Sequence, residues 1–290
     1  MPSQVIYKKL SKTEWFVFLI IAGAAVLSFV ALNVKAQGDS FLHVYFLDVG
    51  QGDGILINFN GNQVLIDGGP DNKVLQELGR VMPFNDRSID LVVLTHPDAD
   101  HINGLIKVLE RYEIANILEN PFEEHNTPTY QKWNELKTEA KITQAEWGQT
   151  IDLGSGAYLE VLYPVSIDVD QSKTNNNSII AKLVYGENEL LLTGDIEAKI
   201  ERELVGRGIN IDADLLKVPH HGSKTSTTDE FLDAITPEAA FIQVGTDNRY
   251  GHPHSTVLER LDSHGIKYHR TDIDGAIELL LDGRNYKINQ

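Results

Sequence analysis

Apolar runs alternate with polar turns along most of the chain, and the spacing of the apolar residues separates predicted strands from predicted helices. Residues 91–94, Leu-Val-Val-Leu, form an unbroken apolar run, which predicts a strand buried on both faces. Beyond it, apolar residues recur at the helical positions 102, 105, 106, 108 and 109. The pattern therefore predicts a strand, a turn and a helix, and α/β sheets bind ligands in such turns.

The same patterning extends through the rest of the chain from residue 40. Hairpins are predicted around Asn60-Gly61-Asn62 and around Gly186-Glu187-Asn188. Thr127-Pro128 predicts a helix start, with the helix running to Ala140. Residues 215–218 and 239–244 read as further buried strands. Strands followed by helix–strand units occur twice in this order, without an internal sequence repeat.

The N-terminal residues differ from all those that follow. Three lysines, at positions 8, 9 and 12, precede about twenty nearly uncharged residues at 15–34, which is long enough to cross a bilayer as a helix. Basic residues before the span favour a cytoplasmic N-terminus and export of the remainder. Residues 34–36, Val-Lys-Ala, also resemble a cleavage site. We interpret residues 1–36 as a transmembrane anchor or signal peptide, with anchoring favoured and secretion expected if the segment is cleaved.

Composition narrows the function classes only slightly. The 290 residues carry a formal net charge of −17, which argues against a nucleic-acid coat protein but not against an enzyme with a locally cationic groove. The chain contains no cysteine, so neither a disulfide partner nor a thiolate metal site is expected.

Residue types that bind metals follow several of the predicted strands. The set consists of Asp67, His96, Asp98, Asp100, His101, Asp195, His220 and His221. Polar groups at the edge of a core are costly unless a cation or hydrogen-bond partners satisfy them. A solvated acidic turn that caps a helix is the alternative for the cluster at 96–101, but it leaves two histidines unexplained. Ligands from several strands at one rim are what a two-metal hydrolase requires.

Five longer strings resemble the metallo-β-lactamase superfamily and, more closely, the C-terminal domain of ComEC/Rec2-type competence proteins. They lie at residues 46–53, 95–105, 191–197, 218–223 and 248–254. The resemblance covers roughly 41–283 and implies an α+β fold, a four-layer αββα sandwich with a metal site at one edge of two facing sheets. Residues 40–285 would form this hydrolase domain. The resemblance also implies a proposed role in degrading one DNA strand during uptake. Such competence proteins carry a polytopic channel, which this chain lacks, so only the chemistry of the domain is carried over.

The resemblance also implies a ligand set for one or two divalent ions. Its members are His96, Asp98, Asp100, His101, Asp195 and His220, with His221 as the alternative to its neighbour. The wider superfamily usually has His in place of Asp98 and a further His near 175–178, whereas the competence branch shares the Asp and an Asn/Ser pattern. An oxygen-rich site shifts the preference from Zn²⁺ towards Mn²⁺, with Mg²⁺ a third option.

Other residues are expected around the ligands. Asp67 would orient a ligand histidine from behind, and Asp48 and Gln51 lie on a glycine-rich turn that would face the rim or simply form a tight turn. His252 or His254 would protonate a leaving group or hold a phosphate, unless both lie on a surface loop. Lys224 and Arg249 would bind substrate. The catalytic candidates are Asp100, His252 and His254, and the rim candidates include Asn175 and Ser178.

We therefore expect a metal-dependent phosphodiesterase or nuclease that acts on DNA or other nucleic acid outside the cytoplasmic membrane. A hydrolase of lactones, β-lactams or thioesters is the first alternative, and Asp98 argues against it. A non-catalytic extracellular binding module is the second, and the intact ligand series argues against that.

Overall fold

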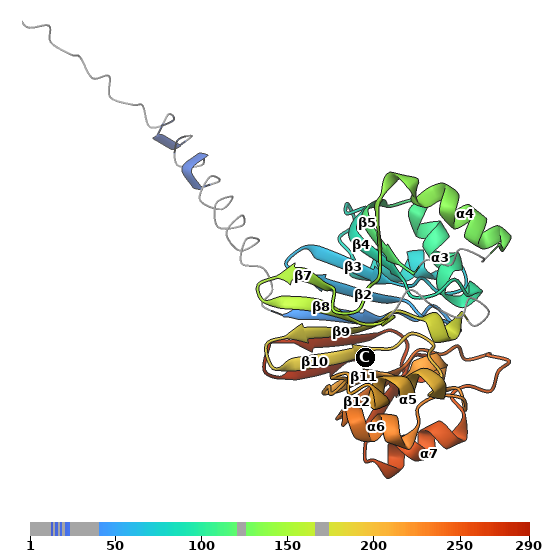
Figure 1. Ribbon diagram of the computed structural model, residues 1–290. Coiled ribbons are helices and arrows are strands. Elements are labelled where there is room, and N and C mark those ends of the chain that lie inside the picture. Colours follow the sequence, from blue (N-terminus) through green and yellow to red (C-terminus); the bar gives the residue numbers. More distant parts are fainter. Residues whose placement is uncertain are drawn as a thin grey trace, which may run out of the picture. The chain divides into compact units, whose positions relative to one another are not determined.

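The computed structural model describes residues 13, 15–16, 18, 21–23, 41–120, 126–165 and 174–290 (Figure 1). The chain divides into the N-terminal unit Met1–Ser40 and the compact unit Phe41–Gln290. The predicted anchor or signal segment at 1–36 lies mostly outside the described residues. Within the ranges described, no helix has both the length and the apolar character needed to cross a bilayer.

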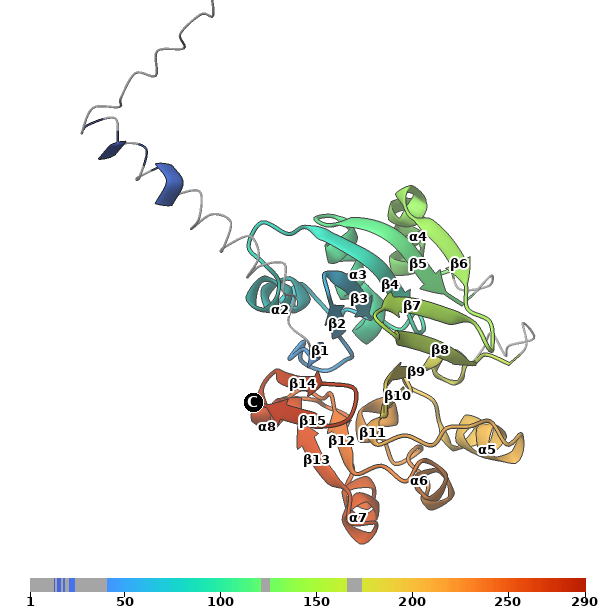
Figure 2. The same cartoon turned by 90° about the vertical axis from the view of Figure 1, so that its left-hand side faces the viewer.

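Two β-sheets form the centre of the compact unit (Figures 1 and 2). The first has the order β15-β14-β1-β2-β3-β4-β5-β6 and the second the order β13-β12-β11-β10-β9-β8-β7. The first contains β1 (Leu42–Phe46), β2 (Ile55–Phe59), β3 (Asn62–Ile66), β4 (Ser88–Leu94), β5 (Glu113–Glu119), β6 (Lys141–Gln144), β14 (Ile277–Leu281) and β15 (Tyr286–Asn289). The second contains β7 (Thr150–Gly154), β8 (Ala157–Tyr163), β9 (Ile180–Tyr185), β10 (Asn188–Leu192), β11 (Leu215–Lys217), β12 (Ala239–Ile242) and β13 (Lys267–Arg270).

Helices cover the outer face of each sheet (Figure 2). Buried apolar side chains fill the space between the layers. The first sheet carries α2 (Lys73–Val81), α3 (Ala99–Leu109) and α4 (Pro128–Leu136), and the second carries α5 (Ala198–Gly206), α6 (Asp229–Ile235) and α7 (Ser255–Ser263). Short helices are η1 (Lys137–Glu139), η2 (Asn175–Asn177), η3 (Pro219–Gly222) and α8 (Thr271–Asp274). The α+β fold of two facing sheets and flanking helices is therefore confirmed.

Local predictions hold where the sequence signal was strong. Both predicted hairpins form, as β2–β3 and β9–β10. The Thr127 side chain accepts a hydrogen bond of 3.2 Å from the Tyr130 N–H and caps α4, as the Thr-Pro pair predicts. That helix ends at Leu136, however, and a 3₁₀ turn replaces its predicted last residues.

Parallel pairing brings the carboxyl ends of several strands to one edge of the sandwich. Strands β3, β4 and β5 run parallel in the first sheet, as do β10, β11 and β12 in the second. The two sheets meet at this edge, where the Ile179 N–H donates to the Thr95 carbonyl over 3.1 Å. Polar residues that follow these strands must therefore lie near one another.

A close backbone approach fixes the helix that follows β4. A Cβ added to Gly104 of α3 would lie 1.8 Å from the Gly68 carbonyl oxygen, so only glycine permits this packing. The Gly104 N–H donates to the Gly69 carbonyl and the Gly68 N–H to the His101 carbonyl, each over 2.9 Å. The start of α3 is therefore held against the loop that carries Asp67.

Candidate metal centre

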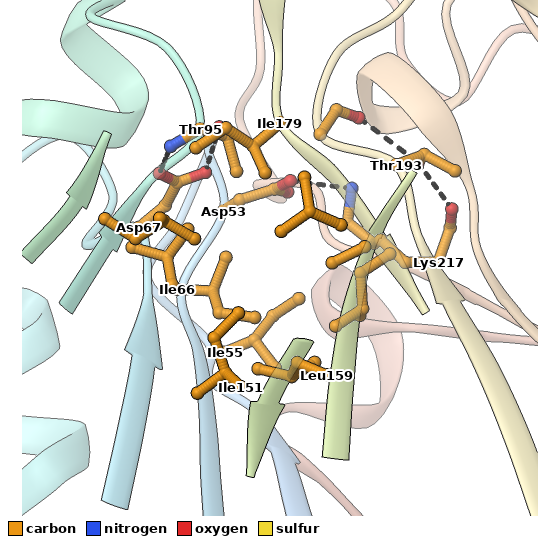
Figure 3. Close-up of a pocket in the computed structure, with 16 residues that line it drawn as sticks. Asp53, Ile55, Ile66, Asp67, Thr95, Ile151, Leu159, Ile179, Thr193 and Lys217 are labelled. Atoms are coloured by element: carbon orange, nitrogen blue, oxygen red, sulfur yellow. Dashed lines mark hydrogen bonds and ion pairs between the residues drawn. The ribbon is translucent and has the colours of Figure 1, made fainter. Parts of the chain in front are cut away.

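Asp67 orients the first of three buried histidines. This carboxylate follows β3 and is completely buried. Its Oδ2 accepts from His101 Nδ1 over 2.8 Å and from the Thr95 hydroxyl over 2.6 Å, while its Oδ1 accepts from the Thr95 N–H over 2.9 Å. The bonds to Thr95 are visible in Figure 3. With Nδ1 occupied, His101 turns its Nε2 towards the edge of the sandwich, as expected for a carboxylate that orients a metal-binding imidazole.

His96 and His221 are oriented in the same way. His96 Nδ1 lies 3.0 Å from the Thr95 hydroxyl, which itself donates to Asp67, and 3.3 Å from the Ser178 hydroxyl. His221 Nδ1 donates to the Gln243 carbonyl over 2.8 Å. These partners accept protons from Nδ1, so each ring directs its Nε2 towards the group, where this atom can bind a cation once it has lost its proton.

The Nε2 atoms of His96, His101 and His221 are buried and form no hydrogen bond within the described part of the chain. A buried polar atom without a partner costs free energy. His101 Nε2 and His221 Nε2 each lie 3.3 Å from Asp195 Oδ2. These atoms have the position and chemistry of ligands to a common cation.

Carboxylates complete this group of atoms. Asp100 Oδ2 lies 3.5 Å from His221 Nε2, and Asp98 Oδ2 lies 3.9 Å from His96 Nε2. Donor atoms of Asp100, His101, Asp195 and His221 all lie within 4.8 Å of one another, and those of Asp67, His96 and His101 form an overlapping group. Imidazole nitrogens and carboxylate oxygens in this number suit a divalent ion, so the residues present fit a metal. Because both Asp67 oxygens are already hydrogen-bonded, we regard Asp67 as support for His101.

The alternative of a solvated helix cap does not describe this turn. Asp98 is the N-terminal flanking residue of α3, but its side chain makes no capping hydrogen bond. The carboxylate instead lies beside His96.

The charges within the group are strongly coupled. Burial alone would lower the pKa of both His101 and His221. The carboxylates of Asp195 and Asp67 nevertheless raise the pKa of His101 well above the ordinary range. Those of Asp195 and Asp53 do the same for His221. Burial would raise the pKa of Asp195, yet the same two imidazoles hold it well below its usual value. Burial lowers the pKa of His96, and the neighbouring charge of His101 lowers it further. The fold thus holds negative charge where a cation would bind.

The backbone decides which member of the His220–His221 pair joins the group. Both residues of η3 adopt left-handed conformations, with φ of 51° and 54°. His221 points to Asp195, whereas His220 Nε2 lies 4.0 Å from Asp195 Oδ2 and accepts from Asn175 Nδ2 over 3.2 Å. The structure therefore places the alternative residue, His221, inside the group and His220 at its rim.

Ser178 lies behind the group. Its hydroxyl accepts from the Asp195 N–H over 3.0 Å and donates to the Asn175 carbonyl over 2.7 Å. Its hydroxyl also contacts His96, so Ser178 connects the residue that follows β10 with one that follows β4. Ser178 therefore lies behind the group, and Asn175 lies beside His220 at its rim.

Of the two candidate residues on the glycine-rich turn, one pairs with a lysine of α2 and the other with the segment after β12. Asp48 pairs with Lys73 Nζ at 2.8 Å and turns towards α2, which agrees with the reading of a plain tight turn. The Gln51 side chain accepts from the Gly245 N–H over 3.3 Å and ties this turn to the segment after β12. The residue of the turn that reaches the group is Asp53, whose Oδ1 lies 3.3 Å from His221 Nδ1.

Sequence reasoning missed Asp53 and its partner. Asp53 Oδ2 lies 2.8 Å from Lys217 Nζ, and both side chains are buried between the sheets (Figure 3). The available signal was a lysine within the otherwise apolar run at 215–218.

The remaining predicted residues lie on two loops. The ring centroid of His252 lies 5.7 Å from that of His220 and 6.4 Å from that of His221. His254 caps α7, because its Nδ1 accepts from the Thr256 N–H over 3.4 Å. Lys224 and Arg249 are exposed. His252 is thus beside the group, whereas the His254 ring serves the helix.

Residues 47–245 match the sequence profile of the Metallo-beta-lactamase superfamily. The chain belongs to the metallo-β-lactamase superfamily. Superfamily membership and the His/Asp group together support a metal-dependent hydrolase with divalent ions.

Within this superfamily the chain is similar to two curated bacterial proteins. It is 32% identical to ComE operon protein 3 of Bacillus subtilis over 87% of this chain and 34% of that protein. It is 30% identical to Recombination protein 2 of Haemophilus influenzae over 89% of this chain and 31% of that protein. The chain therefore spans about a third of the length of these relatives.

Solved structures share the superfamily fold at low sequence identity. The metallo-beta-lactamase fold protein YhfI from Bacillus subtilis superposes with a TM-score of 0.52 at 13% identity. The match covers 80% of this chain and 97% of YhfI. This similarity concerns the fold alone.

Proposed function

We propose that the chain is a metal-dependent phosphodiesterase that cleaves nucleic acid, with DNA as the first candidate substrate. The observation that carries the proposal is the set of three buried Nε2 atoms and three carboxylates, one buried and two part-buried, with exposed cations at positions 224 and 249 on the neighbouring loops. Hydrolysis of a phosphodiester needs an activated water and neutralisation of the charge on the phosphate oxygens. The metal ligands would serve the first need and the exposed cations the second.

The proposed ligands are His96, Asp98, Asp100, His101, Asp195 and His221, with His220 at the rim. When bound, a divalent cation would supply Lewis acidity, which activates water and polarises the phosphoryl oxygens. Asp67, Gln243 and Ser178 hold the imidazole rings in place from behind. This support fixes the direction of each Nε2 lone pair before substrate arrives.

His252 would hold the phosphate. Burial and the charges of His221 and His220 lower its pKa to about 4, so its ring is neutral near pH 7. A neutral imidazole can donate one hydrogen bond to a phosphate oxygen but is a poor proton donor to a leaving group. We therefore favour the binding role over the acid role, and we assign phosphate neutralisation to Lys224 and Arg249.

The relatives support a nucleic-acid substrate. Recombination protein 2 is named for recombination, and Competence protein ComA of Neisseria gonorrhoeae, at 31% identity, is named for competence. The basic flank and apolar run at 1–36 would place the domain outside the cytoplasmic membrane, either anchored or secreted. Protease treatment of intact spheroplasts would test this location, since a protected domain contradicts it.

The decisive experiment is a substrate comparison with purified protein that has been stripped and reloaded with metal. Single-stranded DNA, double-stranded DNA, RNA and a simple phosphodiester form one arm, and a lactone, a β-lactam and a thioester form the other. We expect cleavage in the first arm only, with Asp195→Asn inactive in both. Ready hydrolysis of a lactone or β-lactam with every phosphodiester left intact would overturn the proposal.

A further inference from the structure

One side chain forms three hydrogen bonds across the loop between β12 and α7. Asn248 Nδ2 donates to the carbonyls of Gly245 and His252, over 2.9 and 2.8 Å. Its Oδ1 accepts from the His252 N–H over 2.9 Å. These three bonds close the loop around Arg249 and Tyr250, so the backbone that carries these two side chains is held in place.

The same loop is fixed against the candidate metal centre. The His254 N–H donates to the Gly222 carbonyl over 2.8 Å. A Cβ added to Gly222 would lie 2.7 Å from Pro253 Cβ, so the two segments pack without space between them. The end of the loop at Pro253 and His254 is therefore packed directly against the residue that follows His221.

Aromatic rings continue from the metal centre to the surface along this loop. The His252 ring lies 5.7 Å from the His220 ring, and the Tyr250 ring lies 5.7 Å from His252 at an interplanar angle of 25°. Tyr250 is 56% exposed, and the guanidinium of Arg249 lies 5.3 Å from its ring centroid. An aromatic ring that stands in water beside a reaction site, with a cation over it, has the composition of a stacking surface for nucleobases.

We propose that Tyr250 is a stacking subsite for one nucleobase next to the phosphate that is cleaved, an inference that rests on the proposed function. Stacking needs no positive charge, so it can help to hold a polyanion on a chain with a net charge of −17. Arg249 lies over the same ring and donates to its hydroxyl over 3.3 Å, so a base that stacks there would displace the guanidinium and leave its charge for the adjoining phosphate.

The geometry selects a substrate class. A base can lie on Tyr250 only if it has left its own stack, which is easiest in a single strand or at a frayed end. Every base has a π-face, so the subsite would tolerate all four bases. The proposed enzyme therefore prefers single-stranded nucleic acid with little sequence preference.

The test compares Tyr250→Ala and Tyr250→Phe with the wild type on two single-stranded oligonucleotides of equal length. One carries bases, and the other carries abasic residues on the same backbone. Phe84→Ala is the matched control, because Phe84 is 92% exposed and precedes β4, at the edge opposite the metal centre. A second readout needs no turnover, since 2-aminopurine in the oligonucleotide loses fluorescence when it stacks on a ring of the metal-free protein.

We expect Tyr250→Ala to raise KM for the base-containing strand about 10-fold, with kcat and cleavage of the abasic strand unchanged. Tyr250→Phe and Phe84→Ala should match the wild type, and only Tyr250→Ala should lose the 2-aminopurine quenching. Equal effects of Tyr250→Ala on both strands, or unchanged KM and quenching, would overturn the subsite while leaving a phosphodiesterase in place. Wild-type protein that cleaves neither strand would instead count against the proposed function, and the quenching experiment would still decide whether Tyr250 stacks on a base.

Discussion

Asp53 Oδ2 lies 2.8 Å from Lys217 Nζ, and this buried ion pair joins the two sheets beside the metal centre. Asp53 lies two residues before Ile55, the first residue of β2, and Lys217 ends β11. Burial would raise the pKa of Asp53, but the charges of Lys217 and His221 hold it below its usual value. Both residues also line an interior cavity of about 20 Å³, which is large enough for one water molecule (Figure 3).

Replacing one residue of this ion pair should lower the free energy of unfolding more than replacing both residues. We expect Lys217→Met to lower the free energy of unfolding by about 3–5 kcal/mol, because it leaves a charged carboxylate buried without its partner. The double variant Asp53→Asn/Lys217→Met should recover more than half of that loss. Urea unfolding in EDTA measures both effects without a contribution from metal. A double variant as unstable as the sum of the two single variants would contradict this account.

Asp195 is expected to be essential for metal retention. Asp195→Asn, and equally Asp100→Asn, should abolish hydrolysis because the amide removes a charge that faces His101 and His221. Folding should survive, as judged by circular dichroism, while metal content measured by mass spectrometry falls. Asp262→Asn, an exposed position on α7, is the control and should retain both metal and activity. An inactive Asp195→Asn variant with full metal content would show that the residue acts in another way.

Metal preference should follow the oxygen ligand at position 98. Asp98 Oδ2 lies 3.9 Å from His96 Nε2, so its carboxylate would share an ion with that imidazole. We expect Mn²⁺ to restore stripped protein better than Zn²⁺, and Asp98→His to move the preference back towards Zn²⁺. Activity after titration with each metal gives the answer. Wild-type protein that binds two zinc ions tightly and works best with them would refute the argument.

Metal binding should tighten as the pH rises. In the metal-free protein, Asp195 raises the pKa of His101 and His221, so both rings hold two protons near neutral pH. Their stabilisation of the metal-free fold is complete below the ordinary histidine pKa of about 6.5 and is lost as the pH rises through the raised values. A cation must displace these protons, so binding near pH 7 should release up to about two of them. Calorimetry in buffers of different ionisation enthalpy measures the release, and an affinity independent of pH from about 6 to 8 would contradict it.

Lys224 and Arg249 should act on substrate binding through charge alone. We expect Lys224→Ala and Arg249→Ala to weaken nucleic-acid binding and to flatten its dependence on salt by about one unit of logarithmic slope for each lost phosphate contact. Lys267→Ala is the control, because this exposed lysine begins β13 at the opposite edge. Titrations at several salt concentrations provide the slopes, and a slope unchanged in both variants would remove these residues from the binding surface.

The sequence predicted those parts of the site that depend on local pattern. The apolar run before His96 forms β4, as its pattern predicts. Asp67 supports His101, because the carboxyl ends of neighbouring parallel strands lie at the same edge of a sheet. The sequence pattern did not predict contacts that depend on how the two sheets pack together. The pairing of Asp53 with Lys217 depends on the packing of one sheet against the other, and nothing in either local string specifies it. The choice between His220 and His221 depends on left-handed backbone angles that spacing does not reveal.

The register between β1 and β14 sets an order of events during synthesis. Leu42 pairs with Leu281, so β1 receives its second neighbour only after the ribosome has synthesised residue 281. Until then one edge of β1 offers unpaired backbone groups, beside side chains such as Val44 and Phe46 that end up fully buried. A nascent or shortened chain that stops before β14 would therefore expose the edge of β1 to pairing with other chains.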